Sequence, residues 1–113
     1  MSNLWEETIE LLKENDKTFD DVLYIQGEYF KVTKENFEIV AKKIDYDGGF
    51  GAQHVATDLV LVGDGWWIGR CEYDGSEWWE FKTIPTEKDK VEQIYHLGNG
   101  MWDTIKDLNE DKL

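Results

Sequence analysis

The amino-acid sequence predicts an α+β fold: an antiparallel sheet with helices packed on at least one face. The strongest observation lies in residues 58–84, where three β-forming runs are separated by Asp-Gly dipeptides at 64–65 and 74–75, as in a three-stranded meander. A second observation is that two stretches before this segment have apolar side chains at helical spacing. The length of 113 residues suits one core, so we expect residues 1–113 to form a single domain.

A first helix is predicted over residues 2–16. Asn3 can cap its start, and Glu6 follows three positions later, which is the spacing of a capping box. Its outer face is acidic. The expected buried face consists of Trp5, Ile9 and Leu12.

A hairpin and a second helix follow. A Gln-Gly dipeptide separates two short β-forming runs, which predicts an N-terminal hairpin with strands near 22–25 and 29–32. Thr33 can cap a helix over 33–44. The apolar residues at helical spacing in that segment are Phe37, Val40, Ala41 and Ile44.

The remaining segments flank the meander. Residues 45–58 are glycine-rich without apolar periodicity, which indicates a long loop. The meander begins with the run "DLVLV", whose apolar character predicts a central strand that is covered on both faces. After Pro85 we expect a helix over 86–95, a break at "HLGNG", and a last short helix over 101–108.

Two Trp-Trp pairs in the meander raise the question of which ring is buried. Because side chains alternate across a strand, one ring of each pair faces the core. If the second Asp-Gly turn had an odd number of loop residues, Trp67 and Trp79 would share the core face. Trp66 and Trp78 would then lie opposite, with Arg70 beside a cross-strand carboxylate; a two-residue turn would mix these sets.

The odd-loop alternative gives a specific core. We then expect Trp67→Ala to cost on the order of 3–5 kcal/mol. The second face is either covered by a helix or forms an exposed protein-binding platform, with a carbohydrate platform as a third alternative. The expected core residues are Phe37, Val40, Ile44, Val60, Val62, Trp67, Trp79 and Phe81.

Composition excludes several classes of function. The formal charge of −13 repels nucleic acid and anionic lipid, so we expect neither direct nucleic-acid binding nor membrane binding. With one Cys and two His residues, we expect no closed zinc site and no cofactor. Residues 45–48 resemble the start of a calcium loop, but Phe50 stands where that loop needs Gly. No secretion signal or membrane span is recognisable, which favours a cytoplasmic location.

Catalysis has two sets of candidate residues. Cys71 could pair with His54 or His96 as nucleophile and base, but its mid-strand position on the expected core face favours an inert thiol. Glu72 and Glu80 could share one sheet face as an acid and base, although charged strand residues are usually just solvated. We therefore expect a protein without enzymatic activity.

Binding to a basic protein is the function that the charge favours. A strongly negative protein is steered toward positive grooves, and an exposed tryptophan can anchor the contact. The alternative is that the charge only maintains solubility. The candidate partner-binding residues are Glu6, Glu7, Glu10, Glu14, Asp45, Asp47, Asp58, Trp66, Glu72, Trp78 and Glu80.

One segment of the sequence resembles a group of known proteins. "DLVLVGDGWWIGRCEYDGSEWWEFKTIP", with its paired tryptophans and "EYDGSEWWEFK", resembles a segment of short acidic proteins from phage and prophage regions of Gram-positive bacteria. In size and charge the chain is also similar to anti-CRISPR and anti-restriction inhibitors, several of which imitate the charge of DNA. The segment resemblance implies a lineage but no known activity, whereas the similarity in size and charge implies an inhibitor of a basic, nucleic-acid-binding host defence protein. The alternatives are a phage structural or assembly component, a neutral interaction protein, and a small hydrolase-type enzyme.

Overall fold

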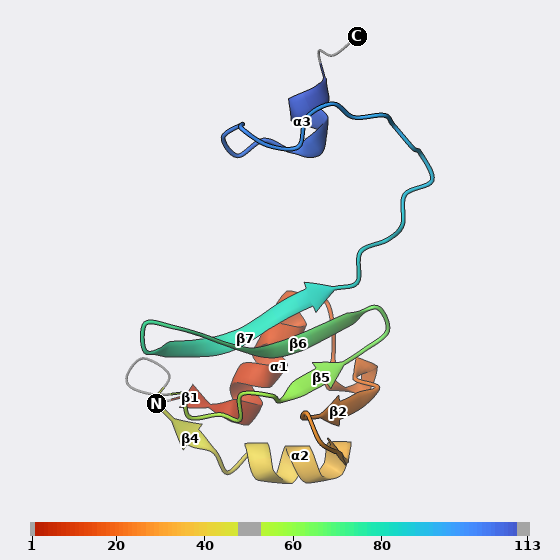
Figure 1. Cartoon of the computed structure of the whole chain (residues 1–113). Helices are drawn as coiled ribbons and strands as arrows, with labels where there is room; N and C mark the ends of the chain where they lie inside the picture. The colour runs from red at the N-terminus through yellow and green to blue at the C-terminus, as the bar shows by residue number, and fades with distance from the viewer. Residues whose placement is uncertain (1, 48–52, 111–113) are drawn as a thin grey trace.

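The computed structural model describes residues 2–47 and 53–110 and confirms the α+β fold. A five-stranded antiparallel sheet has the order β3-β2-β5-β6-β7, and strands β1 and β4 form a separate two-stranded ribbon (Figure 1). The elements are β1 (Ser2–Asn3), α1 (Leu4–Glu14), the 3₁₀ turn η1 (Phe19–Asp21), β2 (Tyr24–Gln26), β3 (Lys31–Val32), α2 (Lys34–Ala41), β4 (Asp45–Tyr46), β5 (Val60–Val62), β6 (Trp66–Tyr73), β7 (Ser76–Thr83) and α3 (Ile105–Asn109).

Helices α1 and α2 begin at the caps that the sequence predicts. The Asn3 side chain accepts a hydrogen bond from the backbone N–H of Glu6 at 3.1 Å, and the Thr33 hydroxyl accepts one from Asn36 at 3.0 Å. The buried face of α1 differs from the expected one, since Trp5 and Ile9 are only half-buried. The residues of α1 that enter the core are Leu4, Thr8 and Leu12.

Both helices pack on the same face of the large sheet. Leu12 of α1 and Phe37 of α2 join one buried cluster with Ile25, Leu61 and Ile68. These three sheet residues are cross-strand neighbours on β2, β5 and β6, so they form a continuous apolar row under the helices. We call this side of the sheet the helix face.

The turn between β6 and β7 decides which tryptophans face the helices. Tyr73 pairs with Ser76, so the loop consists of Asp74 and Gly75 alone. Both have positive φ, 51° and 83°, as a type I′ hairpin turn requires. The odd-loop alternative is therefore wrong. The two-residue turn places Trp66, Ile68 and Arg70 opposite Thr83, Phe81 and Trp79 on the helix face.

The core consequently contains Trp66 in place of Trp67. Trp66 is 4 % exposed and stacks on Phe81 with ring centroids 5.5 Å apart. A Cβ at Gly63 would lie 2.1 Å from the Trp66 ring, so glycine at that position makes room for the indole. Trp67 is only half-buried and lies on the other side of the sheet, where the Lys82 ammonium sits 4.8 Å from its ring centroid.

The other expected core residues divide into three groups. Phe37 and Trp79 are buried, and Ile44 and Phe81 pack partly buried against the core, as expected. The prediction for Val40 is wrong, because this side chain is 49 % exposed. Val60 and Val62 are half-buried on the same side of the sheet as Trp67.

The second side of the sheet, which we call the open face, has no helix on it within the described residues. β5 is central, as predicted, but it is covered by helices on one side only. The thiol of Cys71 also lies here, which makes its expected placement on the core face wrong. The open face consists of Tyr24, Gln26, Val60, Val62, Trp67, Cys71, Trp78, Glu80 and Lys82.

Residues 84–110, which we call the C-terminal arm, leave the end of β7 and stand clear of the sheet (Figure 1). The helix expected over 86–95 is absent, because residues 84–104 contain neither helix nor strand. Only α3 forms, shorter than expected, with Thr104 and Asp107 making a reciprocal capping box. Every residue from 84 to 107 is exposed, so the arm's apolar side chains lack the tertiary packing that stabilises helices in proteins.

The two tryptophans at the start of β6 provide a matched test of this register. We expect Trp66→Ala to lower the free energy of unfolding by about 3–5 kcal/mol, since it empties a fully packed site. Trp67→Ala should lower the free energy of unfolding by only about 1–2 kcal/mol, because the Trp67 ring is already partly exposed to solvent. Urea denaturation of both variants measures the difference, and an equal or reversed order would contradict the two-residue turn.

Candidate functional site

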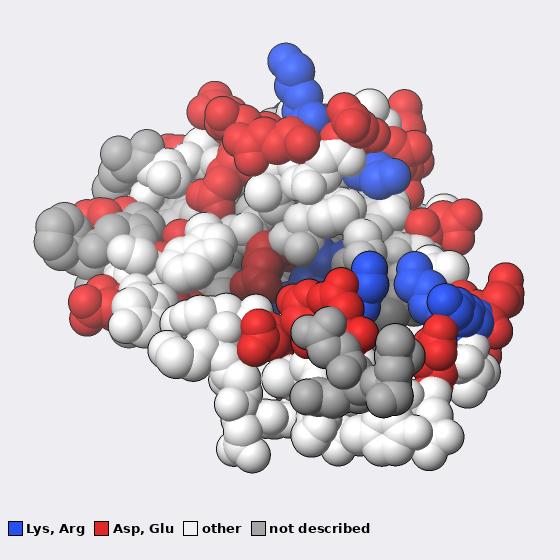
Figure 2. Space-filling view, turned by 90° about the horizontal axis from the view of Figure 1, so that it is seen from above, with Lys and Arg blue, Asp and Glu red and all other residues white. Residues whose placement is uncertain are grey.

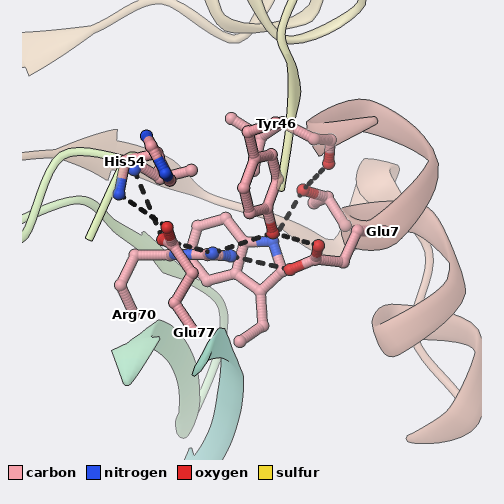
Figure 3. Close-up of polar contacts among 9 residues, drawn as sticks. Glu7, Tyr46, His54, Arg70 and Glu77 are labelled. Atoms are coloured by element: carbon pink, nitrogen blue, oxygen red, sulfur yellow. Dashed lines mark hydrogen bonds and ion pairs between the residues drawn. The ribbon is translucent and has the colours of Figure 1, made fainter. Parts of the chain in front are cut away.

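A buried arginine lies at the centre of the most organised polar cluster in the described chain. Arg70, on β6, points toward the helices, and its side chain is 0 % exposed. Nη1 donates to a carboxylate oxygen of Glu7 on α1 at 2.8 Å. Nη2 donates to Glu77 on β7 at 2.9 Å and to the hydroxyl of Tyr46 on β4 at 2.9 Å (Figure 3). One guanidinium therefore contacts three separate elements, and we call this group the Arg70 cluster.

Glu77 extends the cluster to the segment before β5. Its carboxylate accepts hydrogen bonds from the backbone N–H groups of His54 at 2.6 Å and Val55 at 3.3 Å (Figure 3). Burial alone would raise the pKa of Glu77. The two backbone donors and the Arg70 guanidinium outweigh that effect and hold its pKa below the ordinary value, so the side chain stays ionised.

Aromatic rings form the walls of the cluster. The Arg70 guanidinium carbon lies 4.8 Å from the ring centroid of Trp79 and 5.5 Å from that of Tyr46. The Trp79 indole N–H donates to the Thr8 hydroxyl at 2.9 Å, and that hydroxyl donates to the Leu4 carbonyl at 2.7 Å. Among the buried side-chain nitrogens and oxygens of the described residues, only Nε of Arg70 has no hydrogen-bond partner.

Tyr46 joins the ribbon to α1. Its hydroxyl donates to Glu7 while accepting from Arg70. Burial and the hydrogen bond to Glu7 raise the pKa of Tyr46 to about 12, so the phenol stays protonated through the neutral range. For Arg70, desolvation opposes the charged form, but the bonds to Glu77, Glu7 and Tyr46 prevail and raise its pKa. These shifts favour a charged Arg70, an ionised Glu77 and a protonated Tyr46 near neutral pH.

Sequence reasoning found part of this cluster. It expected Arg70 to lie near a cross-strand carboxylate but did not identify Glu77, which makes this contact from a diagonal position on β7. It assigned Glu7 to the solvent-facing side of the first helix and missed Tyr46 entirely. A usable signal was that Arg70 is the only arginine in a chain with 12 Lys and Arg residues, and arginine is the cation best suited to buried multidentate pairs.

An acidic surface depression lies over the Arg70 cluster, between α1 and β7; we call it the acidic hollow. Two partner-binding candidates, Glu10 and Glu14, stand one helical turn apart on its α1 side, and neither forms an ion pair within the described residues. Trp78, a third candidate, is 39 % exposed on its β7 side. The lining residues are Glu7, Glu10, Leu11, Glu14, Glu77, Trp78 and Trp79.

Three other partner-binding candidates are buried or form hydrogen bonds within the fold. Trp66 is buried, so its expected role as an exposed anchor is wrong. Asp45 accepts a hydrogen bond from the Asn3 amide at 2.9 Å, and Asp58 accepts one from the backbone N–H of Glu28 at 2.7 Å. Both carboxylates therefore act in the fold.

The remaining acidic candidates are scattered. Glu6 is exposed near the start of α1. Glu72 is exposed near the β6–β7 turn, whereas Glu80 lies on the open face with its carboxylate 4.0 Å from the Lys82 ammonium. Asp47 is exposed directly before residues 48–52, and these five positions of the predicted loop lie outside the described residues.

The catalytic candidates are not assembled. Cys71 faces its neighbour Glu80, and a hydrogen bond with this carboxylate, with some burial, raises the pKa of the thiol and so disfavours the thiolate. Within the part of the chain that the structure describes, no hydrogen bond joins Cys71 to the His54 or His96 side chain. Across the same residues, no group of three or more His, Cys, Asp and Glu side chains is placed to hold a metal ion.

Two further findings concern the whole chain. No helix among residues 2–47 and 53–110 is long and apolar enough to cross a lipid bilayer. Comparisons with protein-family models, with curated proteins and with solved structures give no match to this chain.

Removing the Arg70 charge should be severely destabilising. We expect Arg70→Met to lower the free energy of unfolding by about 3–5 kcal/mol, because it leaves the buried Glu77 carboxylate without its cation. The exposed ion pair between Lys42 and Glu38 provides the control, and Lys42→Met should cost less than about 1 kcal/mol. Chemical denaturation measures both, and a cost for Arg70→Met as small as the control would contradict a central role for the cluster.

The lowered pKa of Glu77 predicts how the stability of the protein depends on pH. Its folded pKa lies below the unfolded value of about 4.3, so its stabilising contribution is full above that value and is lost as pH falls through the folded pKa. The unfolding free energy of Glu77→Gln should therefore decrease less than that of the parent protein as the pH is lowered. Glu28→Gln, at an exposed position, should leave it unchanged. Unfolding free energies measured over the acid range test this, and identical slopes for parent and Glu77→Gln would refute it.

Proposed function

We propose that this protein is a non-enzymatic protein-binding module whose acidic hollow receives a basic side chain of its partner. The observation that carries the proposal is the placement of Glu10 and Glu14, both without ion-pair partners in the described chain, beside the exposed ring of Trp78. A lysine or arginine could lay its stem along the indole and direct its charge at the carboxylates. Glu77 is already saturated by Arg70 and backbone donors, so it shapes the hollow without competing for that cation.

Net charge supports the same class of partner. A formal charge of −13 accelerates encounter with a positive surface, and the field reaches about 8 Å at physiological ionic strength. Figure 2 shows carboxylates on several sides of one view of the molecule, with Lys and Arg between them. This interspersed pattern favours recognition at a local site, such as the acidic hollow, over mimicry of a long stretch of DNA.

A nucleic-acid-binding protein of a host defence system is the partner class that we favour. Such a protein has a groove rich in Lys and Arg, which offers the cationic side chains that the hollow fits. The chain's resemblance in size and charge to anti-CRISPR and anti-restriction inhibitors supports this choice. On this proposal the protein is phage-encoded, acts in the host cytoplasm, and blocks the groove by partial imitation of DNA charge.

A second candidate is an assembly component of a phage. The observation that favours it is the C-terminal arm, whose large apolar side chains are exposed. Exposed apolar surfaces of this kind commonly mark a contact with a neighbouring subunit or partner. An assembly component would co-purify with virions, whereas an inhibitor would appear early in infection and free of particles.

Affinity capture from the natural host tests the proposed function. We expect a basic, nucleic-acid-binding protein to be retained at low salt and largely released at high salt, with identification by mass spectrometry. Glu10→Gln combined with Glu14→Gln should reduce capture by about tenfold or more, since two charge-assisted contacts are lost. Glu28→Gln combined with Glu87→Gln makes the same change in net charge at exposed sites away from the hollow and should retain most binding. The proposal would be contradicted if the partner were retained equally at low and high salt, or if both double variants lost the same amount of partner binding.

A further inference from the structure

Two apolar surfaces of this chain are left uncovered by the fold. The open face presents Trp67 and Trp78 on a sheet whose opposite side is packed under α1 and α2. The C-terminal arm exposes a second set of large side chains, with Trp102 97 % exposed. The arm residues that matter most here are Val91, Tyr95, Leu97, Met101, Trp102 and Ile105. Exposed apolar area on this scale in a small protein marks an interaction surface.

The arm is directed away from its own sheet. The backbone N–H of Ile84 donates to the carbonyl of Gly65 at 3.0 Å, which fixes the first residue of the arm to the turn between β5 and β6. Pro85 then disfavours the helical conformation at Ile84 and keeps the chain extended as it departs. The molecule is 60 Å along its longest axis and 32 Å along the next, which reflects this projection (Figure 1). Docking on its own open face would require the chain to reverse at that extended, anchored point.

The end of the arm is an ordered unit. The Asn109 side chain accepts hydrogen bonds from the backbone N–H groups of Tyr95 at 2.8 Å and His96 at 2.9 Å, and donates to the His96 carbonyl at 2.9 Å. These bonds close residues 95–109 into one lobe around α3. The exposed apolar residues of the lobe are therefore already gathered, which lowers the ordering cost of docking.

We propose that the C-terminal arm of one copy docks on the open face of a second copy, and that the second arm docks reciprocally, giving a two-fold symmetric dimer. A second copy suits the arm because the two surfaces complement each other in charge as well as in apolar character. Lys82 and Lys31 sit over the Trp67 and Tyr24 rings, at 4.8 Å and 5.2 Å from their centroids. In the lobe, Asp103 and Asp107 outnumber Lys106, and Glu110 follows the lobe directly in the sequence.

The area available is sufficient for a stable dimer. Fully exposed aromatic side chains bury about 150–250 Å² each, so Trp102, 97 % exposed, and Tyr95, 63 % exposed, contribute together about 240–400 Å² per arm. The aliphatic residues of the arm and the rings of the open face add to this. Because a two-fold exchange makes the contact twice, the total approaches the ~1,600 Å² of a standard specific interface. Trp78 borders both the open face and the acidic hollow, whereas Glu10 and Glu14 lie on the α1 side only. The dimer is therefore tested with variants at other positions than Trp78, which keeps its failure distinguishable from failure of the proposed function.

Sedimentation analysis of the full chain over a wide range of concentration tests the exchange. We expect a species of twice the 13.3 kDa chain mass. Trp102→Asp on the arm, and Trp67→Glu on the open face, should each weaken dimerisation by about tenfold or more. Because Trp67→Glu could impair folding, the exposed pair Lys31→Glu and Lys82→Glu serves as a second open-face variant. Tyr29→Asp removes an aromatic that is 84 % exposed outside both surfaces, and it should dimerise like the parent.

Mixing the variants distinguishes exchange between copies from folding back within one. The arm variant and the lysine variant should each be weak dimers alone but should form a mixed dimer, which retains one intact contact. Alkylation of Cys71 on the open face should slow as the parent dimerises. A monomer at all concentrations with Cys71 protected would mean that the arm covers its own sheet, and a monomer with Cys71 accessible would mean that no arm docks. Either result, or the absence of a mixed dimer, would overturn the proposal.

Discussion

The guanidinium of Arg70 carries a full positive charge into a position with no solvent exposure, where loss of hydration costs several kcal/mol unless other groups replace the water. The carboxylates of Glu7 and Glu77, the hydroxyl of Tyr46 and the rings of Tyr46 and Trp79 do so, and they come from α1, β4 and β7. Glu77 in turn fixes the backbone at His54 and Val55. The position of the N-terminal helix, the small ribbon and the segment leading into β5 all depend on this one cation.

The surface features follow from the same arrangement. Glu7 turns inward to reach Arg70, while Glu10 and Glu14, on the same helix, remain at the surface and give the acidic hollow its charge. Strand alternation sends Trp79 against the guanidinium and leaves its neighbour Trp78 on the outer side. The buried charge cluster and the proposed surface site for a cation are thus built from adjacent residues of the same two elements.

Local signals in the sequence were sufficient for most of the fold. Asn3 and Thr33 cap their helices as expected because capping depends on a few adjacent residues, and the Asp-Gly dipeptides mark both turns of the meander. The tryptophan assignment failed because one loop residue more or less exchanges the two faces of a hairpin. The helix expected over 86–95 failed for a different reason: its residues are all exposed and pack on no other part of the described chain, so tertiary contacts do not stabilise it. Tyr46 and Glu7 were missed because their contacts with Arg70 span 24 and 63 positions, which no local pattern encodes.

Amide hydrogen exchange at His54 and Val55 tests the central claim most directly, because their N–H groups reach the Arg70 cluster only through Glu77. We expect both amides of the parent protein to exchange much more slowly than unbonded surface amides, and we expect that protection to fall together with the protection of α1 when Arg70 is replaced by Met. Exchange of His54 and Val55 at the rate of free amides in the parent, or protection unaffected by the replacement, would show that the cluster does not hold these segments together.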